Sequence, residues 1–361
     1  MVSSNDGAER ERFVLLDGMR GLAALAVITD HVPSTLFTTL LPGRYLAVDF
    51  FFVLSGFVLA HVYSRRLASG LSPLAFMRMR VVRLYPLYLL GAAAGGVLMA
   101  LHIVRGWNDA SLAQLATSTL FALFMLPCPP PASLWENAPY PLNGPSWSLF
   151  FELFINLIFA LAAPRLTPRL CLMIAGIGAI LLVPTAFAFG QLDGGFAWTN
   201  FVAGFPRVTF SFFAGIFLYQ TRSHWRRPAL PAWAGYLALA AVFMVPATGV
   251  WRSLFDLVAV LILFPALVAF CGGSDVRGAL AKVSSAVGTS SYGVYILHVP
   301  LWGWLQLVLG RLHLDLPGAV DVLLTAAVAL GIAAVLHTVY DTPLRRWLSL
   351  RRTPPVALAG D

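Results

Sequence analysis

Two basic residues near the start of the chain, Arg20 and His31, have types and a spacing that could serve chemistry. They are eleven positions apart in the apolar stretch LDGMRGLAALAVITDH. Eleven residues of α-helix turn through about 1100° and rise about 16 Å, so both side chains are expected on one helix face. An ionised residue inside a bilayer costs roughly 2.5–3.5 kcal/mol on insertion scales. Two such residues on one face therefore favour a functional interior over an accident of packing.

Three more candidate residues interrupt later apolar segments. Glu152 lies in NGPSWSLFFELFINLIF, where a carboxylate inside a span needs a partner or a pathway. In SSYGVYILHVPLW, His298 lies about 15 Å into its predicted helix and Tyr295 precedes it by one turn. Each residue could also have a structural role. Glu152 could form an ion pair that joins two helices, and His298 could be a buried core residue whose nitrogens are hydrogen-bonded. The ordinary pKa of histidine lies near neutrality, so two histidines in the apolar segments, His31 and His298, favour acid–base chemistry.

A pair of arginines, Arg80 and Arg83, lies one turn apart in RMRVVRLYPLYLL. Guanidinium groups bind phosphate oxygens through paired hydrogen bonds. This pair, together with Arg20 or Arg78, therefore predicts a phosphate clamp at the mouth of the third predicted span. Anchoring of the helix at the membrane surface is the alternative. In VDFFFVLSGF, the hydroxyl of Ser55 can bond across a helix interface, and packing is its simplest role.

The composition identifies a membrane protein. Hydrophobic residues make up 59% and charged residues only 11% of the chain, and the mean hydropathy is +0.79, whereas about a quarter of the residues in soluble domains are charged. A bilayer core of about 30 Å requires about 20 apolar residues per helix. We therefore predict an all-α, polytopic protein. Its ten transmembrane helices are expected near residues 14–36, 45–63, 84–104, 147–163, 170–190, 200–219, 230–248, 253–271, 288–309 and 318–340.

The distribution of basic residues sets the predicted topology. With ten crossings and both termini cytoplasmic, only Arg44, Arg105, Arg252 and Arg311 lie outside, which satisfies the positive-inside rule. A further apolar stretch at 112–126 would reverse every later segment if it crossed. We predict that it stays in an outer excursion, as a candidate re-entrant segment. Anionic membrane lipid facing the cytoplasmic arginines accounts for the net charge of +8 without a nucleic-acid partner.

Processing signals and additional domains are not evident in the sequence. The polar start runs into a long apolar segment with no small-residue cleavage site, so an uncleaved first helix is expected. The three cysteines, Cys128, Cys171 and Cys271, lack metal or redox spacing, and Cys128 is expected in an outer, exposed loop. No polar stretch reaches the roughly 50 residues of a small domain. We predict a single membrane domain over 1–361, without an appended soluble domain.

Five motifs, in order within residues 13–347, resemble those of the acyltransferase-3 family of integral membrane O-acyltransferases. LDGMRGLAALAVITDH matches its Arg-x10-His signature, and VDFFFVLSGF matches its second-helix motif. RVVRLYP matches its Arg-x-x-Arg motif. PSWSLFFE is similar to its Trp-Ser-Leu-x-x-Glu, and SSYGVYILHVP to its Ser-Tyr-x-x-Tyr-x-x-His. Asp30 and Asp341 depart from the family pattern, which weakens inference about the substrate but leaves the reaction class intact.

The resemblance implies an enzyme of the bacterial inner membrane that uses acyl-CoA as co-substrate, with acetyl-CoA as the expected donor, and no metal. The acceptor it implies is a hydroxyl of a cell-surface or exported glycan, free or lipid-linked. Some family members carry a hydrolase-like domain that takes part in transfer. Here we expect the chain to act alone or with a separate periplasmic acyl-transfer partner.

Acyl transfer gives the candidate residues roles. A hydroxyl attacks a thioester slowly unless a base removes its proton, and His31 is the predicted base. A donor to the developing oxyanion is expected among His298, Tyr295 and Ser55. Glu152 is expected in the outer half with His31. Direct and two-step transfer both fit the sequence.

A transporter or flippase of a glycan or lipid intermediate is the alternative function, because its coupling residues would look much the same. Two features count against it. The two halves of the chain show no detectable repeat, and the arginines cluster on one side.

Overall fold

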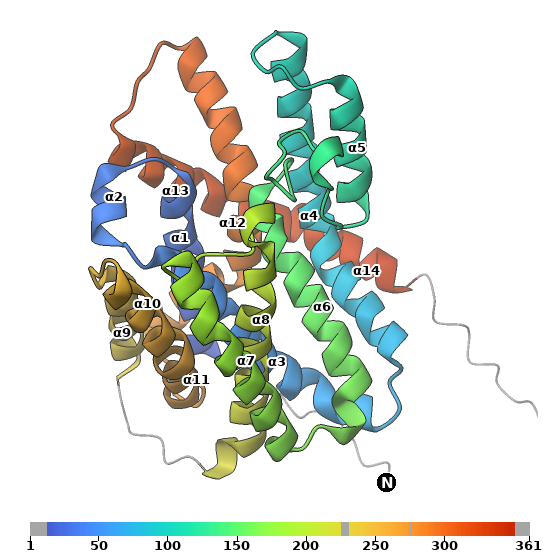
Figure 1. Cartoon of the computed structure of the whole chain (residues 1–361), viewed down its shortest axis with the longest axis vertical. Coiled ribbons are helices and arrows are strands. Elements are labelled where there is room, and N and C mark those ends of the chain that lie inside the picture. The colour runs from blue at the N-terminus through green and yellow to red at the C-terminus, as the bar shows by residue number, and fades with distance from the viewer. Residues whose placement is uncertain (1–12, 225–230, 275, 351–361) are drawn as a thin grey trace, which may run out of the picture.

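The computed structural model describes residues 13–224, 231–274 and 276–350, which form a bundle of helices without a strand in these ranges (Figure 1). The α-helices are α1 (Val14–His31), α2 (Thr35–Leu40), α3 (Ala47–Ala68), α4 (Pro73–Val104), α5 (Leu112–Leu123), α6 (Trp147–Ala162), α7 (Pro168–Phe189), α8 (Gly204–Thr221), α9 (Ala232–Met244), α10 (Val250–Val258), α11 (Phe264–Cys271), α12 (Gly278–Arg311), α13 (Gly318–Leu336) and α14 (Thr342–Leu350). Single π-helical turns join α10 to α11 and α13 to α14.

Eight helical segments of the described chain are long and apolar enough to cross a membrane. They comprise α3, α4, α6, α7, α8, the joined α10 and α11, α12, and the joined α13 and α14. The two other predicted spans fall on α1, which carries Asp17, Arg20 and Asp30, and on α9, which has only 13 residues. The all-α, multi-pass class is confirmed. The count of ten and the side of the termini stay predictions.

The apolar stretch at 112–126 contains α5 (Leu112–Leu123), which packs along α4 at the upper end of the bundle in Figure 1. Its 12 residues span about 18 Å, less than a bilayer core. The hydroxyl of Tyr88 donates to the carbonyl of Ala122 at 2.7 Å, which gives a hydrogen bond to one of the carbonyl groups in the last turn of α5. Cys128, expected to be exposed, is instead 1% exposed, because its thiol packs against Ser118 of α5 at 3.8 Å.

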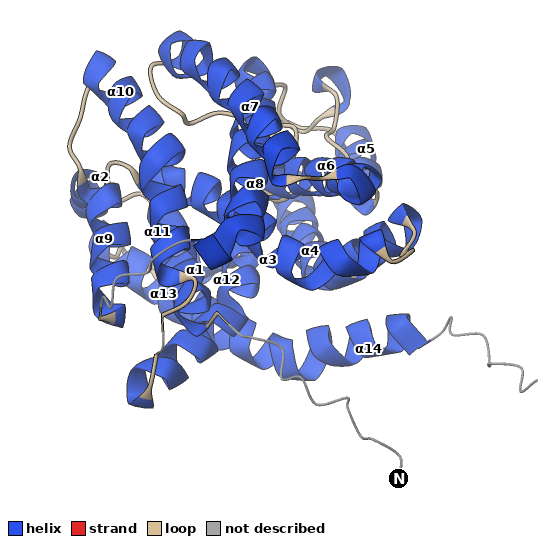
Figure 2. Ribbon diagram, turned by 90° about the horizontal axis from the view of Figure 1, so that it is seen from below, coloured by secondary structure: helices blue, strands red, loops and turns tan. Residues whose placement is uncertain are grey.

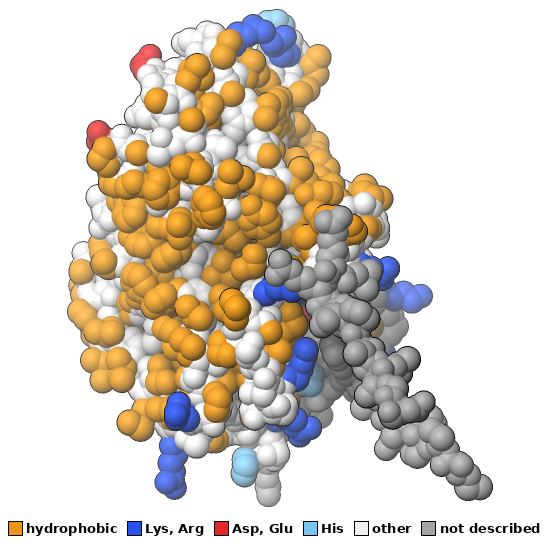
Figure 3. Space-filling model, turned by 90° about the vertical axis from the view of Figure 1, so that its right-hand side faces the viewer, with side chains coloured by type: hydrophobic (Ala, Val, Ile, Leu, Met, Phe, Trp, Pro, Cys, Tyr) orange, Lys and Arg blue, Asp and Glu red, His pale blue; other side chains and the backbone are white. Residues whose placement is uncertain are grey.

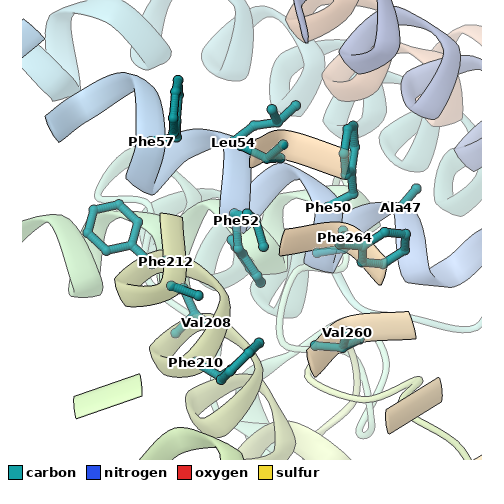
Figure 4. Close-up of a cluster of buried hydrophobic side chains, with 14 of the residues drawn as sticks. Ala47, Phe50, Phe52, Leu54, Phe57, Val208, Phe210, Phe212, Val260 and Phe264 are labelled. Carbon is teal, nitrogen blue, oxygen red and sulfur yellow. The ribbon is translucent and has the colours of Figure 1, made fainter. Parts of the chain in front are cut away.

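The core lies where α3 crosses α8. A Cβ at Gly56 of α3 would overlap the carbonyl oxygen of Phe212, and one at Gly215 of α8 would overlap that of Val53, so glycine is required at both positions for the backbones to touch. Close backbone approach of this kind is the usual role of small residues between membrane helices. Aromatic side chains fill the space around the crossing (Figure 4), among them Phe50, Phe52, Phe57, Phe212 and Phe264.

A second close contact joins α1 to α12. A Cβ at Gly288 would lie 2.6 Å from the carbonyl oxygen of Asp17, and one at Gly18 would lie 2.8 Å from the Cβ of Ser284. Because α1 carries Arg20 and α12 carries the tyrosines and histidine of the late motif, this contact sets the distances between the candidate site residues.

A fully buried ion pair fastens α3 to α8. Arg207 donates from Nη2 to Asp49 at 2.6 Å and from Nε at 3.1 Å, and both side chains are 0% exposed. The guanidinium also donates to the carbonyl of Gly194 and lies over the ring of Trp147. Removing one partner of such a pair leaves an uncompensated buried charge, which costs about 3–5 kcal/mol.

The outer surface is apolar around the middle of the bundle. Figure 3 shows hydrophobic side chains over most of one face, with Lys and Arg side chains at its ends and along one edge. Helix α7 contributes exposed Leu172, Ile177 and Ile180, as expected of a surface in contact with lipid. Viewed from below, α14 runs beside the bundle rather than within it (Figure 2).

The predicted topology can be tested with cysteines placed in exposed loops. The native Cys128, Cys171 and Cys271 are all buried, so a membrane-impermeant maleimide should react with none of them. On intact cells it should label Glu136→Cys, in the loop after α5, and leave Ser223→Cys, after α8, unlabelled until the cells are permeabilised. Labelling of Ser223→Cys on intact cells would reverse the predicted orientation.

Candidate active site

A cavity of about 160 Å³ lies between α1, α3, α4, α6 and α12. It gathers most of the residues that the sequence singled out, although they come from five separate motifs. Its polar lining consists of Arg20, Ser55, Arg80, Arg83, Ser148, Glu152, Thr289, Ser291, Tyr292 and Tyr295.

Glu152 is held on the arginine side of this cavity. Arg80 donates to its Oε1 at 2.6 Å, and the hydroxyl of Ser55 donates to the same oxygen at 3.1 Å. From the sequence, Glu152 is expected in the outer half with His31, and this placement stays a prediction. Glu152 pairs with Arg80 because α4 carries this long side chain two turns past Pro73, to the level of the carboxylate.

The three arginines of the cavity differ in how they are occupied. Arg20 donates to the hydroxyl of Ser291 at 2.8 Å and to the carbonyl of Gly288 at 2.7 Å, and it pairs with Asp17 at 3.0 Å. Arg83 is exposed to the cavity and has no hydrogen-bond or ion-pair partner among the residues that the structure describes. Arg83 is therefore the arginine whose donors are free for a ligand.

Arg78, the further candidate for phosphate binding, lies outside the cavity lining. Its guanidinium donates to the carbonyl of Leu348 on α14 at 3.2 Å. Arg78 does not line the cavity because it is two residues from Arg80 on α4, which turns its side chain about 200° away. Arg83, three residues from Arg80, lies on the same helix face as Arg80.

His31 and His298 form a pair whose protonation follows from their partners. His298 is 0% exposed, and its Nδ1 lies 2.8 Å from the carbonyl oxygen of Tyr295. Because a carbonyl only accepts, this Nδ1 carries the proton, and Nε2 of neutral His298 is an acceptor. The Nδ1 of His31 lies 3.2 Å from that Nε2 and 3.1 Å from the carbonyl oxygen of Val27, and because both are acceptors, this Nδ1 carries the proton. The Nε2 of His31 is then unprotonated, as a general base requires.

Tyr295 separates the histidine pair from the cavity. It lines the cavity, whereas His31 and His298 do not. Its ring lies 5.4 Å from that of Phe51 and 6.2 Å from that of His298, between centroids. Its hydroxyl is 2.7 Å from the hydroxyl of Ser148. The arginine-lined cavity and the candidate base thus meet at one aromatic side chain.

Sequence reasoning missed Asn143, which supports this region. Pro300 of α12 has no N–H to donate to the carbonyl of Ile296 one turn earlier. Asn143 supplies the missing donor, with its Nδ2 2.8 Å from that carbonyl oxygen. The proline two positions after His298 was the signal that could have prompted a search for a buried amide.

The C-terminal end of α1, which carries His31, also carries charged groups. Asp30, whose partner the sequence could not identify, pairs with Arg44 at 3.0 Å. Asp193 lies in the loop between α7 and α8, and burial followed by the charge of Asp30 raises its pKa to about 7. Within the described residues, no group of three or more His, Cys, Asp or Glu side chains is arranged to hold a metal ion.

Comparison with known proteins shows the family to which the chain belongs. Residues 13–338 match the acyltransferase domain that defines the acyltransferase-3 family. The chain is 30% identical over 401 residues to acyltransferase MdmB of Streptomyces mycarofaciens, covering 97% of this chain and 95% of that protein. It is 37% identical over 188 residues to protein 2 in the picA locus of Rhizobium radiobacter, covering 50% of this chain and 97% of that protein. No solved structure matches.

The chain therefore belongs to the acyltransferase-3 family and is a multi-pass membrane acyltransferase. An acyl donor and an acyl acceptor are its substrates. Membership of this family supports group transfer rather than the alternative of a transporter or flippase.

The histidine pair generates a prediction about His298. If His298 acts by holding His31 in the required tautomer, His298→Leu should lower kcat about a hundredfold, within the range for loss of general-base catalysis, with little change in donor KM. His298→Gln, whose Oε1 can accept from His31, should retain more activity. Equal losses in both variants, or a change in donor KM alone, would assign His298 a structural role only.

Proposed function

We propose that this protein transfers an acetyl group from cytoplasmic acetyl-CoA to a hydroxyl group of an exported or cell-surface glycan, in the bacterial inner membrane. One observation carries the proposal. A cavity with an unpartnered arginine, suited to a phosphorylated donor, ends at Tyr295, and a histidine pair with one free basic nitrogen lies directly behind this side chain.

The donor is proposed to enter with its phosphates at Arg83. Arg80 cannot serve equally, because Glu152 already occupies its Nη2, and Arg20 is held by three protein partners. Charge-assisted hydrogen bonds from guanidinium to phosphate are about twice as strong as neutral ones. The thioester end of the donor would then extend through the cavity toward Tyr295.

The reaction follows from the two sides of Tyr295. The Nε2 of His31 accepts the proton of the acceptor hydroxyl while its oxygen attacks the thioester carbonyl. The hydroxyl of Tyr295, which lies 3.2 Å from the carbonyl oxygen of Pro145 and 2.7 Å from the hydroxyl of Ser148, would turn to donate to the oxyanion that develops. When the C–S bond breaks, the CoA thiolate takes the proton from His31 and leaves. The cavity does not reach His31, so transfer requires the Tyr295 or Phe51 side chain to move aside.

The acceptor is proposed to approach from the outer end of α1. The carboxylates of Asp30 and Asp193 are hydrogen-bond acceptors at this end, and hydroxyl groups of a sugar are suitable donors to them. These groups therefore fit the glycan acceptor that the family motifs imply. A polar, outward-facing approach also suits an acceptor that is already exported.

The proposal is tested by supplying acetyl-CoA labelled in the acetyl group to the purified protein together with cell-envelope glycan. We expect alkali-labile label on glycan hydroxyls, and mass spectrometry should show loss of the same acetyl groups in cells without the gene. Acyl-CoA donors with longer acyl chains should be tested in parallel. If the label stayed in acetyl-CoA, the proposed donor would be wrong. Label on the glycan would also exclude a protein that only transports.

His31 should be essential for this activity. His31→Ala should lower kcat by about 10²–10⁴, the usual contribution of a general base, while the protein remains folded. His102→Ala, on the far end of α4, is the matched control and should behave as the wild type. Near-normal turnover of His31→Ala would remove His31 from the mechanism.

Arg83 should set the affinity for the donor. Hydrogen bonds to charged groups contribute about 1.5–3 kcal/mol, so Arg83→Ala should raise the acetyl-CoA KM about tenfold or more. Arg83→Lys should restore little, because the planar fork is lost. Arg65→Ala, exposed near the end of α3, removes an equal charge and should leave KM unchanged. If Arg83→Ala also left it unchanged, Arg83 would not bind the donor.

A further inference from the structure

The donor cavity is too small for the donor that it is proposed to bind. Its volume is about 160 Å³, whereas pockets that enclose even drug-sized ligands hold about 300–1,000 Å³. An acyl-CoA exceeds a typical drug in size, because it joins a thioester arm to a diphosphate and a 3′-phosphorylated adenosine. Only the arm and the diphosphate beside Arg83 fit the cavity, so the 3′-phosphoadenosine end needs a second site.

An open groove of about 610 Å³ runs between α12 and α13, next to this cavity. Thr289 lines both hollows. The lining of this α12–α13 groove consists of Ala281, Lys282, Ser285, Ala286, Thr289, Ser290, Ala334 and His337.

The groove and the cavity are joined by one stripe of α12. Lys282, Ser285, Thr289 and Tyr292 follow one another at spacings of three, four and three residues, which places them on a single helix face. The first three line the groove, and the last two line the cavity. Lys282 is seven residues before Thr289, about 10 Å along the helix. A ligand can therefore extend continuously from the cavity to Lys282.

The charge of the groove suits a phosphate. Lys282 is the only lysine in the chain. It is exposed, and it has no hydrogen-bond or ion-pair partner in the described ranges. Across the groove, His337 lies 3.7 Å from the carboxylate of Asp341, which in turn pairs with Arg345. The small, apolar side chains of the three alanines in the lining leave room for the flat ring of an adenine base.

We propose that the α12–α13 groove binds the 3′-phosphoadenosine end of the acyl-CoA donor, with the ammonium group of Lys282 on the 3′-phosphate. The inference rests on the proposed function, in which acyl-CoA is the donor and Arg83 binds its diphosphate. Continuity through Thr289 favours the donor over a lipid headgroup, because a lipid needs no path into the cavity.

Kinetics with two donors test the proposal. Acetyl-dephospho-CoA lacks only the 3′-phosphate, so the wild type should show an acetyl-CoA KM about tenfold lower than that for the dephospho form. Lys282→Ala should abolish this difference by weakening acetyl-CoA alone. Arg277→Ala, at the residue before α12 and outside the groove lining, is the charge control and should keep the difference. Equal weakening of both donors by Lys282→Ala, or no preference in the wild type, would overturn the proposal.

A second measurement does not depend on turnover. An amine-reactive reagent should modify Lys282 in the purified protein, and peptide mass spectrometry separates it from the N-terminal amine. CoA should protect Lys282, dephospho-CoA should protect it several-fold less, and Arg83→Ala should weaken protection by both. Protection by anionic phospholipid but not by CoA would assign the groove to lipid and refute the inference. Failure of the proposed function would look different, since neither acetylated donor would then transfer label to glycan.

Discussion

The site depends on how closely α1 approaches α12. Gly18 and Gly288 remove the side chains that would hold these helices apart, and Arg20 then bonds across the contact to Ser291 and to the backbone of α12. This register places His31 against His298 at the other end of the same two helices. A methyl group at Gly288 would push the helices apart and break both contacts at once.

Ion pairs hold several buried charges in the described part of the chain. Arg207 with Asp49 and Arg80 with Glu152 each join two helices, and Arg252 pairs with Asp256 within α10. Removing one partner would leave the other charge unpaired away from water, which is costly. Arg83 in the cavity and Lys282 in the groove are exposed and have no protein partner in the described ranges, and we propose that one extended anionic donor contacts both.

Tyr295 lies at the boundary between the cavity and the histidine pair. It lines the cavity, whereas His31 and His298 do not, and the ring of Phe51 packs against it. Under the proposed function, this aromatic contact would keep water and acceptor from the thioester until the side chains move. Transfer would then be favoured over hydrolysis, because the reactive carbonyl would meet an acceptor only when both sites are occupied.

The sequence by itself determined the class of protein, the family motifs and much of the site. Periodicity within one helix was sufficient to place Arg20 and His31 on one face, and to place Arg80 and Arg83 together. Composition was sufficient for an all-helical membrane bundle. These inferences succeed because 3.6 residues per turn fixes the relative direction of side chains along one helix, without information about its neighbours.

Only the tertiary structure decided which groups meet between helices. Glu152 contacts Arg80 rather than His31, Arg78 turns to α14, Cys128 is buried, and Asn143 completes α12 beside Pro300. The bond between His31 and His298 joins residues 267 positions apart in the chain. Such contacts depend on the depth and crossing angle of each helix, which are set by where small residues allow close approach. No local pattern encodes that geometry, because each helix responds to all of the neighbours against which it packs.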